Sequence, residues 1–444
     1  MRERPSKMAT SRQVRRKLVP GVDRLEPRQL LSLMAGSPPA APPLAPALVA
    51  PAAAAAPAPA AAPAGTVTGL HFVTSPNVPN AGLNATAAVP NDPDDVWAVG
   101  SFLDASTNLL TPLAEHFNGT SWSVVATPGL PSGIAGQLLG VAAVASNNVW
   151  AVGNSTGPLI EHWNGTSWSI VPGPSVGAAG TLNAVTAIAA NDVWAVGAAG
   201  GSNLIEHFDG TSWSVVTSPF MRNSHLSGVS GTSSTDVWAV GSAGRSTSDH
   251  VEILHWNGTA WSVVSAPSPG LEPFLTSVVA LAPNDAWAVG EATLPVNSSE
   301  STGQTLIEHW DGTSWSVVPS PNAGGGSPSA GNELLGVAAV SATNIWAVGE
   351  FLDPNLSQFQ TLTEHFDGTS WSVIPSPNAT TGHNFLSGVT ALGTGDVVAV
   401  GGANSADNQT GTDLILANNE PPGSAPVPPA NPPPGPPPSP GIID

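Results

Sequence analysis

Two short phrases recur along most of this 444-residue chain, and their spacing restricts the possible folds more than any other feature. The phrase Trp-Ala-Val-Gly begins at six tryptophans, and a degenerate seventh copy, Val-Ala-Val-Gly, begins at Val398. Successive copies are 44 to 59 residues apart, a range typical of repeats that each form a small antiparallel sheet. The six tryptophans are Trp97, Trp150, Trp194, Trp238, Trp287 and Trp346.

The second phrase is His-aromatic-Asn/Asp-Gly-Thr-x-Trp-Ser, which also occurs six times. Because Asn-Gly or Asp-Gly between apolar runs favours a hairpin, we predict a two-residue turn in which both residues have positive φ. The histidines are His116, His162, His207, His255, His309 and His365. The tryptophans that follow them are Trp122, Trp168, Trp213, Trp261, Trp315 and Trp371.

Each repeat is therefore expected to form four short strands. The first begins at a leucine, the second carries Trp-Ala-Val-Gly, the third ends in the histidine phrase, and the fourth is Trp-Ser-Val-Val or a close variant. Seven such repeats without a helical period predict an all-β protein, a seven-bladed β-propeller of four-stranded antiparallel blades. The predicted first strands begin at Leu83, Leu138, Leu182, Leu226, Leu275, Leu334 and Leu386.

The ends of the repeat array predict how the ring closes. The seventh repeat lacks a fourth strand, since the chain becomes proline-rich soon after Asn418. The missing strand has a counterpart at the other end, where residues 70–77 parallel residues 315–322. We therefore expect the N-terminal strand to complete the last blade, which leaves no open ring edge.

Composition divides the chain into four parts, of which only the repeats can bury a core. They are a basic N-terminal segment (1–35), an Ala/Pro-rich linker (36–65), the propeller (66–420) and a proline-rich tail (421–444), with both low-complexity segments expected to be disordered. Nine of the eleven basic residues precede Gln29, so the chain after residue 28 carries a net charge of −26. Such an acidic body argues against nucleic-acid binding.

The N-terminal segment contains Leu25-Glu-Pro-Arg28 followed by Gln-Leu-Leu31. This stretch resembles the LEPR-XLL region of exported bacterial surface proteins. The resemblance implies a leader for export and an extracellular or cell-surface location. Its apolar run is too short to cross a membrane, and we expect no transmembrane segment.

The repeats themselves resemble those of kelch-type propellers. Kelch repeats have an aromatic residue and apolar residues before Gly-Gly in the second strand, and a tryptophan that opens the fourth. Here the second glycine is present only at Gly402, and the common kelch tyrosine is absent. The Asp-Gly-Thr-Ser-Trp hairpin also resembles the Asp-box turn of sialidase-like propellers, one residue short.

The repeated side chains are expected to be structural. Twelve tryptophans in two columns can hold the ring together, since each buries roughly 200 Å². The six histidines lie on different blades and cannot share one metal ion, so we expect them to pair with nearby hydroxyl or backbone groups. The glutamates that precede five of them point to the opposite strand face and form no dyad with them. These are Glu115, Glu161, Glu206, Glu308 and Glu364.

Enzyme classes can be tested by the residues that they require. A sialidase-like site needs several arginines and a tyrosine, but the chain after residue 28 has two arginines and the whole chain has no tyrosine. A radical copper site of the galactose-oxidase type needs Tyr and Cys, and both are absent. The first strands, expected to line the axis, carry no ionisable group.

Variation in length points to one face of the ring. The connections between strands 2 and 3, and between strands 4 and 1, share a face and vary widely, as in Ser101–Pro112, Glu291–Thr305 and Glu350–Thr361. This face carries acidic residues that could engage a cationic partner or calcium, although charge for solubility is the simpler interpretation. The candidate ligand-binding residues are Asp104, Asp249, Glu291, Glu300, Glu333, Glu350 and Asp353.

The sequence thus predicts a monomeric, non-enzymatic binding or scaffold propeller of an exported or surface protein. Its ligand, a protein or glycan at the cell surface, is expected on the face with the long connections. No catalytic residue, metal ligand or cofactor is assigned. The alternative is a carbohydrate-active hydrolase or lyase that uses loop carboxylates on the same face.

Overall fold

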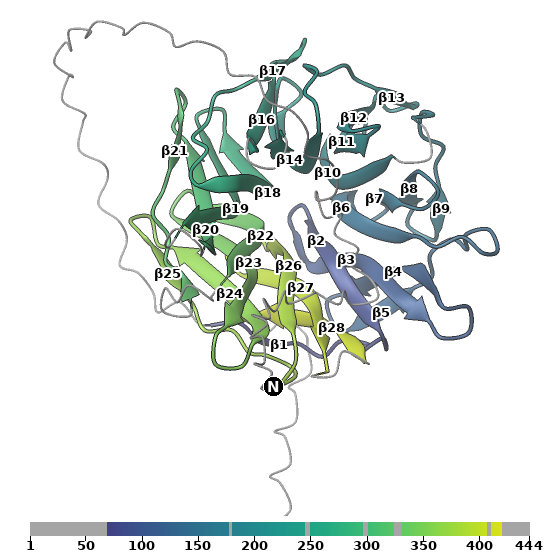
Figure 1. Ribbon diagram of the computed structural model, residues 1–444. Helices are drawn as coiled ribbons and strands as arrows, with labels where there is room; N and C mark the ends of the chain where they lie inside the picture. Colours follow the sequence, from purple (N-terminus) through teal and green to yellow (C-terminus); the bar gives the residue numbers. More distant parts are fainter. Residues whose placement is uncertain are drawn as a thin grey trace, which may run out of the picture.

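A computed structural model describes residues 69–176, 180–244, 249–295, 301–323, 331–405 and 410–419. They form seven four-stranded antiparallel sheets arranged as blades around a central axis (Figure 1). The first strand of each blade is innermost and the fourth is outermost. The predicted seven-bladed β-propeller is confirmed, whereas the N-terminal segment, the linker and the proline-rich tail lie outside the described residues.

The strands of the first four blades begin close to the predicted leucines. Blade 1 is β2 (Ala81–Val89), β3 (Asp92–Asp104), β4 (Leu109–Phe117) and β5 (Trp122–Val125); blade 2 is β6 (Gln137–Ala145), β7 (Asn148–Asn154), β8 (Pro158–Trp163) and β9 (Trp168–Ile170); blade 3 is β10 (Thr181–Ala189), β11 (Asp192–Ala199), β12 (Ser202–Phe208) and β13 (Trp213–Val215); blade 4 is β14 (Ser224–Ser233), β15 (Asp236–Ala243), β16 (His250–Trp256) and β17 (Trp261–Val263).

The last three blades follow the same order, except that the fourth strand of blade 7 is the first strand of the ring. Blade 5 is β18 (Leu271–Ala282), β19 (Asp285–Pro295), β20 (Ser301–Trp310) and β21 (Trp315–Val317); blade 6 is β22 (Asn332–Ser341), β23 (Asn344–Asp353), β24 (Gln358–Phe366) and β25 (Trp371–Val373); blade 7 is β26 (Asn384–Ala391), β27 (Val397–Asn404), β28 (Gly411–Ala417) and β1 (His71–Phe72).

Ring closure by the N-terminal strand is confirmed. Strand β1 pairs antiparallel with β28, so His71 lies opposite Ala417. Two further contacts hold the segment that follows: Ser75 Oγ donates to Asp413 Oδ2 (2.7 Å) and the Val78 N–H donates to Asp413 Oδ1 (2.6 Å). A single buried carboxylate of blade 7 therefore anchors the start of the ring to its end.

The core consists of apolar clusters between adjacent blades. In each of the first five blades the second-strand tryptophan packs on the next blade: Trp97 lies 5.0 Å from Trp163 and 5.2 Å from Trp168, between ring centroids. Blade 7 departs from this pattern, because Val398 replaces the second-strand tryptophan and Leu70 packs beside Trp346. We call each interface between adjacent blades a seam.

The predicted two-residue hairpin turn is wrong. Phe117 pairs with Trp122, which leaves a four-residue loop of Asn118, Gly119, Thr120 and Ser121. Only the glycine has positive φ (84°), because the Asn118 side chain accepts hydrogen bonds from the backbone N–H groups of Thr120 and Ser121, both at 3.1 Å. This side-chain cap replaces the second left-handed residue that a two-residue turn requires.

Candidate functional site

The two faces of the ring differ in their turns. The turns between strands 1 and 2 pack on those between strands 3 and 4, as shown by Trp163, whose indole N–H donates to the Ser146 carbonyl (3.0 Å). The other two connections meet at the opposite end of the blade, where the Asn223 N–H donates to the Gly201 carbonyl (2.9 Å). We call these the short-turn face and the long-loop face.

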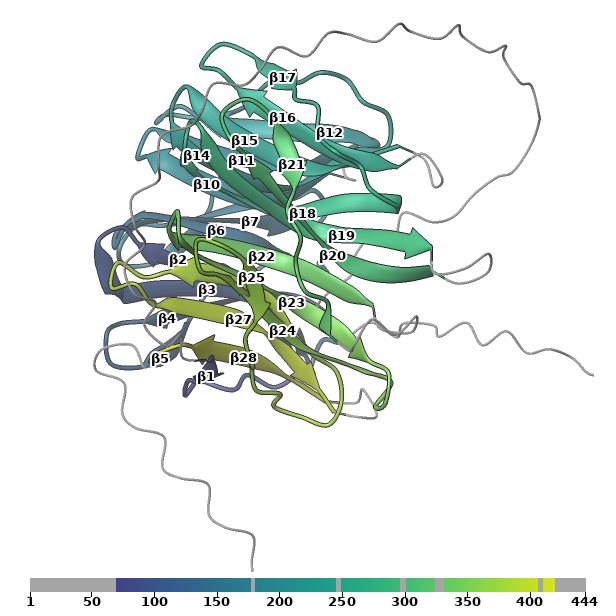
Figure 2. The same ribbon diagram turned by 90° about the vertical axis from the view of Figure 1, so that its left-hand side faces the viewer.

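On the long-loop face, several predicted loops are extended hairpins. Strand β3 has 13 residues, β19 has 11 and β23 has 10, whereas β7 has 7 and β11 has 8. The stretches Ser101–Pro112 and Glu350–Thr361, expected as loops, are therefore mostly paired strand with a four-residue tip. In the side view β19 and β20 extend beyond the adjacent blades (Figure 2).

This face is uneven around the ring. Blades 1, 5 and 6 carry the extended hairpins, while in blades 2 and 3 strands 2 and 3 are joined by residues 155–157 and 200–201 alone. Blades 5 and 6 are adjacent, and blade 1 is separated from blade 6 only by blade 7, whose β27 has 8 residues. The three extended hairpins therefore lie on one side of the ring. The face therefore has a raised side and a low side.

Two of the candidate acidic residues support their own turns. Asp104 Oδ1 accepts from Ser106 N–H (2.8 Å) and Ser106 Oγ (2.7 Å), and these hydrogen bonds hold the pKa of Asp104 below its usual range. Asp353 Oδ1 accepts from the Asn355 N–H (2.7 Å) in the equivalent turn of blade 6. Both carboxylates therefore have a local structural function.

The other candidates lie apart from these two. Glu333 and Glu350 are directly opposite each other on β22 and β23, and Glu333 is buried. Glu291 lies on β19 opposite Thr305, with its carboxyl group beside Gly303. Asp249 precedes β16, and Glu300 lies outside the described residues. Nowhere in the described ranges do three or more His, Asp or Glu side chains gather in a group that could hold a metal ion.

The six histidines pair with acidic or amide side chains rather than with the expected hydroxyl or backbone groups. The partner is the Asp or Asn two residues before the second-strand tryptophan, as in His116 Nε2 and Asp95 Oδ1 (2.8 Å) or His162 Nε2 and Asn148 Oδ1 (2.9 Å). Each histidine ring also packs on that tryptophan, at 4.1 to 4.7 Å between centroids. The remaining partners are Asp192, Asp236, Asp285 and Asn344.

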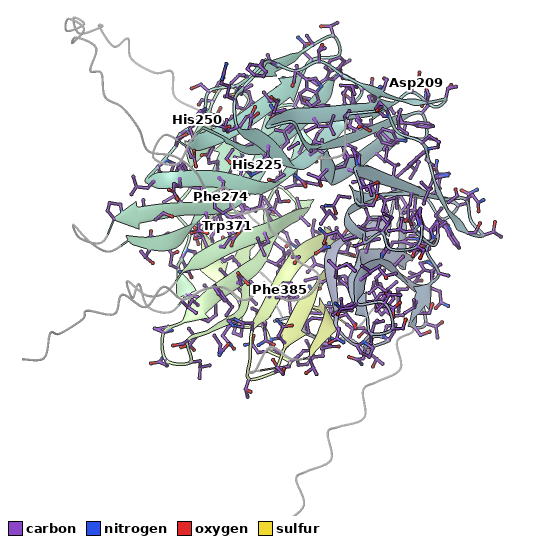
Figure 3. The ribbon with its side chains drawn as sticks, turned by 45° about the vertical axis from the view of Figure 1, so that its right-hand side comes forward. Asp209, His225, His250, Phe274, Trp371 and Phe385 are labelled. Atoms are coloured by element: carbon purple, nitrogen blue, oxygen red, sulfur yellow. The ribbon has the colours of Figure 1, made fainter. Side chains whose placement is uncertain are left out.

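These pairs affect protonation. Burial raises the pKa of Asp95, but hydrogen bonds from His116, Ser146 and Trp97 and the charge of His116 outweigh it, and the net shift is downward. Burial lowers the pKa of His162 and of His365, whose partners are amides without charge. The histidines thus stabilise the blades at the short-turn face, near turns such as that of Asp209 (Figure 3).

The glutamates have a property that the sequence did not reveal. They point away from their histidines, as predicted, but they are buried: Glu115, Glu161, Glu206, Glu308 and Glu364 are each 0% exposed. Within the part of the chain that the structure describes, neither carboxyl oxygen of any of the five has a hydrogen-bond partner. Burial raises the pKa of Glu161 and Glu308 to about 8. Only the neighbouring blade makes these positions interior, so strand alternation alone could not identify them.

A narrow channel of 160 Å³ follows the axis, and the residues that line it come from the first strands of all seven blades. Its polar side chains connect the blades: Asn84 Nδ2 donates to the Leu138 carbonyl, Asn183 Nδ2 to that of Leu226 and Thr276 Oγ1 to that of Leu334, each at 2.7 Å. The lining contains no ionisable side chain, as the sequence predicted.

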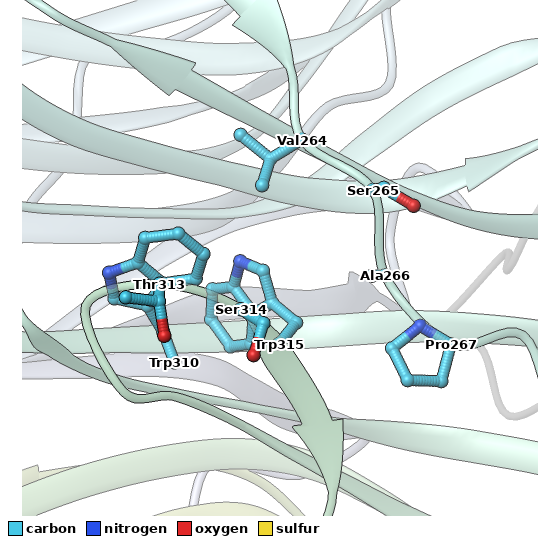
Figure 4. A pocket seen from close by; sticks show the side chains of 8 residues that line it. All are labelled: Val264, Ser265, Ala266, Pro267, Trp310, Thr313, Ser314 and Trp315. Atoms are coloured by element: carbon cyan, nitrogen blue, oxygen red, sulfur yellow. The ribbon is translucent and has the colours of Figure 1, made fainter. Parts of the chain in front are cut away.

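A larger groove of 470 Å³ opens at the rim between blades 4 and 5. Trp310 and Trp315 form one side, and Val264, Ala266 and Pro267 form the other (Figure 4). Trp310 Nε1 already donates to the Pro283 carbonyl (3.1 Å). The hydroxyl side chains of Ser265, Thr313 and Ser314 complete the lining, so the groove combines aromatic, apolar and hydroxyl groups, and none of these described lining residues is charged.

Exposed apolar side chains distinguish the two faces. On the long-loop face Phe220 is 73% exposed, Leu356 56% and Leu271 48%. A second set lies on the outermost strands, one residue per blade, such as Val124 and Val263. Among the described residues, no large aliphatic or aromatic side chain is similarly exposed on the short-turn face.

No protein-family model matches the chain, and no curated protein matches it. Among solved structures, the WD40 β-propeller domain of Doa1 has a TM-score of 0.50 at 12% identity, covering 80% of this chain and 98% of that one. The RRP9 WD40 repeats have a TM-score of 0.50 at 10% identity, covering 78% and 97%. YCF48 bound to a D1 peptide has a TM-score of 0.49 at 13% identity, covering 80% and 98%. The two WD40 likenesses concern the β-propeller fold alone.

A search of the described residues for helices long and apolar enough to span a membrane found none.

Proposed function

We propose that this propeller is a non-enzymatic binding or scaffold module that engages its ligand on the long-loop face. The observation that supports this most directly is the exposure of Phe220, Leu271 and Leu356 on that face. Exposed apolar side chains surrounded by polar residues are typical of interaction surfaces. The raised sector beside a low sector adds a shaped surface, and varied loops on a rigid scaffold are where repeat proteins usually bind.

The candidate acidic residues support a binding surface more than a reaction centre. Asp104 and Asp353 accept hydrogen bonds from their own turns, and each is on a different blade from Glu291. A hydrolytic pair would need two carboxyl groups on opposite sides of one bond, about 5 to 10 Å apart.

A kelch-like repeat type, and export through a leader resembling the LEPR-XLL region, remain part of this proposal, with a protein or glycan at the cell surface as the ligand.

The test is a protein and glycan array probed with the full chain, with and without calcium. Any ligand found is then measured against a Phe220→Ser, Leu356→Ser variant and against a Val215→Ser control. Val215 is 48% exposed, but it lies on the outermost strand of blade 3. We expect the double variant to lose binding by about tenfold or more and the control to retain it. Equal loss in both variants, or turnover of a bound glycan, would refute the proposal.

A further inference from the structure

A buried glutamate of the third strand lies in six of the seven seams. Glu206 illustrates the position: its neighbours on the same strand face, Leu204 and Phe208, pack in a cluster with Val152 and Ile160 of blade 2. Because alternate residues of a strand share a face, Glu206 points into the same seam. A Cβ atom placed on Gly173 of blade 2 would lie 3.5 Å from Glu206 Oε2. The carboxyl group therefore lies among apolar groups of two blades.

The same arrangement recurs around the ring. The sequence Leu-x-Glu-His-aromatic is found in blades 1, 2, 3, 5 and 6, so each of those blades directs one glutamate toward the preceding blade. Blade 4 reverses the order, since Glu252 takes the leucine position and Leu254 the glutamate position. Glu252 is 1% exposed, and its Oε1 accepts a hydrogen bond from Asn203 of blade 3 (2.5 Å).

The seam between blades 6 and 7 is the exception. Blade 7 has leucine at both positions, Leu414 and Leu416, and these pack with Trp346 and Val348 of blade 6. Leu254 and Leu416 show that a leucine fits where the other blades have glutamate. The glutamates are therefore not required to fill the space. The seam between blades 6 and 7, which has leucine at both third-strand positions, is a reference for how a seam packs without such a glutamate.

Few charged groups face these carboxyls. Asp413 faces Glu115 across the closing seam, and its negative charge adds to burial in raising the pKa of Glu115 to about 8. In the other seams, the preceding blade carries its third-strand histidine and, where present, the aspartate paired with it. Blade 4 also carries His225 on β14, whose pKa is lowered by burial. Arg222, the one described arginine, lies in the connection between blades 3 and 4. For Glu161, Glu206, Glu308 and Glu364 burial is the cause of the raised pKa.

An ionised carboxylate without a charged partner cannot remain in such a seam at acceptable cost, and the single hydrogen bond from Asn203 leaves Glu252 Oε2 without a partner among the described residues. We propose that closure of these six seams is coupled to protonation of Glu115, Glu161, Glu206, Glu252, Glu308 and Glu364, so that the ring binds protons as it folds and its seams loosen under alkaline conditions. The balance is simple: each closing seam takes one proton from solvent onto a carboxylate oxygen, and each proton returns to solvent when the seam opens. The seam between blades 6 and 7 takes none.

The direction of the pH dependence follows from linkage. Burial raises the pKa of these carboxyls from an ordinary value of 4.5 to about 7 for Glu206 and Glu252 and about 8 for the others. Between 4.5 and these values the folded chain binds more protons than the unfolded chain, so stability falls as the pH rises. Each glutamate then changes the unfolding equilibrium constant by up to about tenfold per pH unit. His162, His225 and His365, whose pKa values burial lowers below the ordinary value of 6.5, act in the opposite direction below pH 6.5.

The experiment compares urea unfolding of the full chain and of three variants between pH 5 and pH 9. The first variant, Glu161→Gln with Glu308→Gln, removes two titrating groups but keeps their shape, and the second, Glu308→Leu, copies Leu254 and Leu416. The third, Asp209→Asn, is the matched control. It removes a carboxyl from an exposed turn that has asparagine in blades 1, 2 and 4. Hydrogen bonds from the backbone N–H groups of Ser212 and Thr211 hold the pKa of Asp209 below its usual range, so this carboxyl stays ionised between pH 5 and pH 9.

Between pH 5 and pH 7, we expect the unfolding equilibrium constant of the Gln double variant to rise less steeply with pH than that of the wild-type chain. The difference should be up to about a hundredfold per pH unit, since two titrating groups are removed. Asp209→Asn should have the wild-type slope. Identical slopes in the wild-type chain and the Gln double variant would overturn the proposal. Infrared spectra provide a second measurement that needs no variant: the folded chain at pH 6.5 should show the carbonyl stretch of protonated carboxyl groups, and its absence would overturn the proposal as well.

Discussion

At the scale of single residues, the glycine of Trp-Ala-Val-Gly is the most restricted position in the repeat. In every blade it lies against the backbone carbonyl of the residue that precedes the first-strand leucine, as Gly241 does with His225. The first strand has a register shift at this point, between Leu226 and Gly228. The bulge brings the carbonyl so close that a Cβ atom cannot fit, which explains why all seven copies retain glycine.

We therefore predict that Gly241→Ala destabilises the protein by about 3 kcal/mol or more, because the clash is with backbone and a rotamer change cannot relieve it. Urea unfolding measures the loss. Gly129→Ala is the control, since a Cβ atom at Gly129 meets nothing within 4 Å. Similar losses in both variants would contradict this explanation.

The histidine pairs lead to a second prediction at this scale. Asp236 Oδ1 lies 2.7 Å from His255 Nε2, and its Oδ2 accepts from Thr232 Oγ1. Asp236→Ala should cost about 1–3 kcal/mol, because both partners lose their acceptor in a buried site. Asp236→Asn should cost less, since Asn148 and Asn344 hold the equivalent histidines in blades 2 and 6. A chemical-denaturation comparison in which the two variants lose equal stability would count against the pairing.

At the scale of strands and turns, the structure separates what a local pattern predicts from what it does not. Strand number was predictable because apolar alternation and the Asn-Gly or Asp-Gly turns lie within one repeat. Ring closure was predictable because the last repeat lacks a fourth strand and residues 70–77 parallel residues 315–322. The turn geometry was not, since Asn118 caps two N–H groups with its side chain instead of adopting positive φ. The hairpin of residues 101–112 was mistaken for a loop because its strands continue beyond the shared core. The burial of Glu206 depends on Gly173 and Ile160 of another repeat.

Closure of the ring gives the prediction that belongs to this scale. Deletion of residues 66–79 removes β1, the buried Leu70 and both hydrogen bonds to Asp413. These losses amount to several kcal/mol, so the melting temperature should fall by about 10 °C. A deletion of equal length in the linker, residues 38–51, is the control for calorimetry. An unchanged melt after the first deletion would defeat the closure mechanism.

At the scale of the whole molecule, the ring is not uniform. Six blades repeat the tryptophan and histidine contacts, whereas blade 7 has Val398 and Ala417 at the corresponding positions. Among the described residues, Trp346 packs on His365 of its own blade but on no aromatic ring of blade 7. Blade 7 is also the one blade assembled from both ends of the ring. Its seams therefore have fewer large contacts than the others.

We expect blade 7 to open before the rest of the ring. Hydrogen exchange should show amide protection in β27 and β28 lower than in β11 and β12 by about ten- to a hundredfold, because the missing aromatic contacts contribute roughly 1–3 kcal/mol. The comparison is made within one sample, so each blade serves as a control for the others. Uniform protection across all seven blades would show that closure is as strong as the other seams.

The pairing of β1 with β28 also has a consequence in time. His71 is synthesised about 350 residues before its partner Ala417. At roughly 5–20 residues per second, the first strand waits about 20 to 70 seconds for its partner to be synthesised. During that interval blade 1 has no neighbour for the face that carries Glu115 and Phe117. The nascent chain must therefore protect an apolar surface until the last blade arrives, and the ring can close only after β28 has been synthesised.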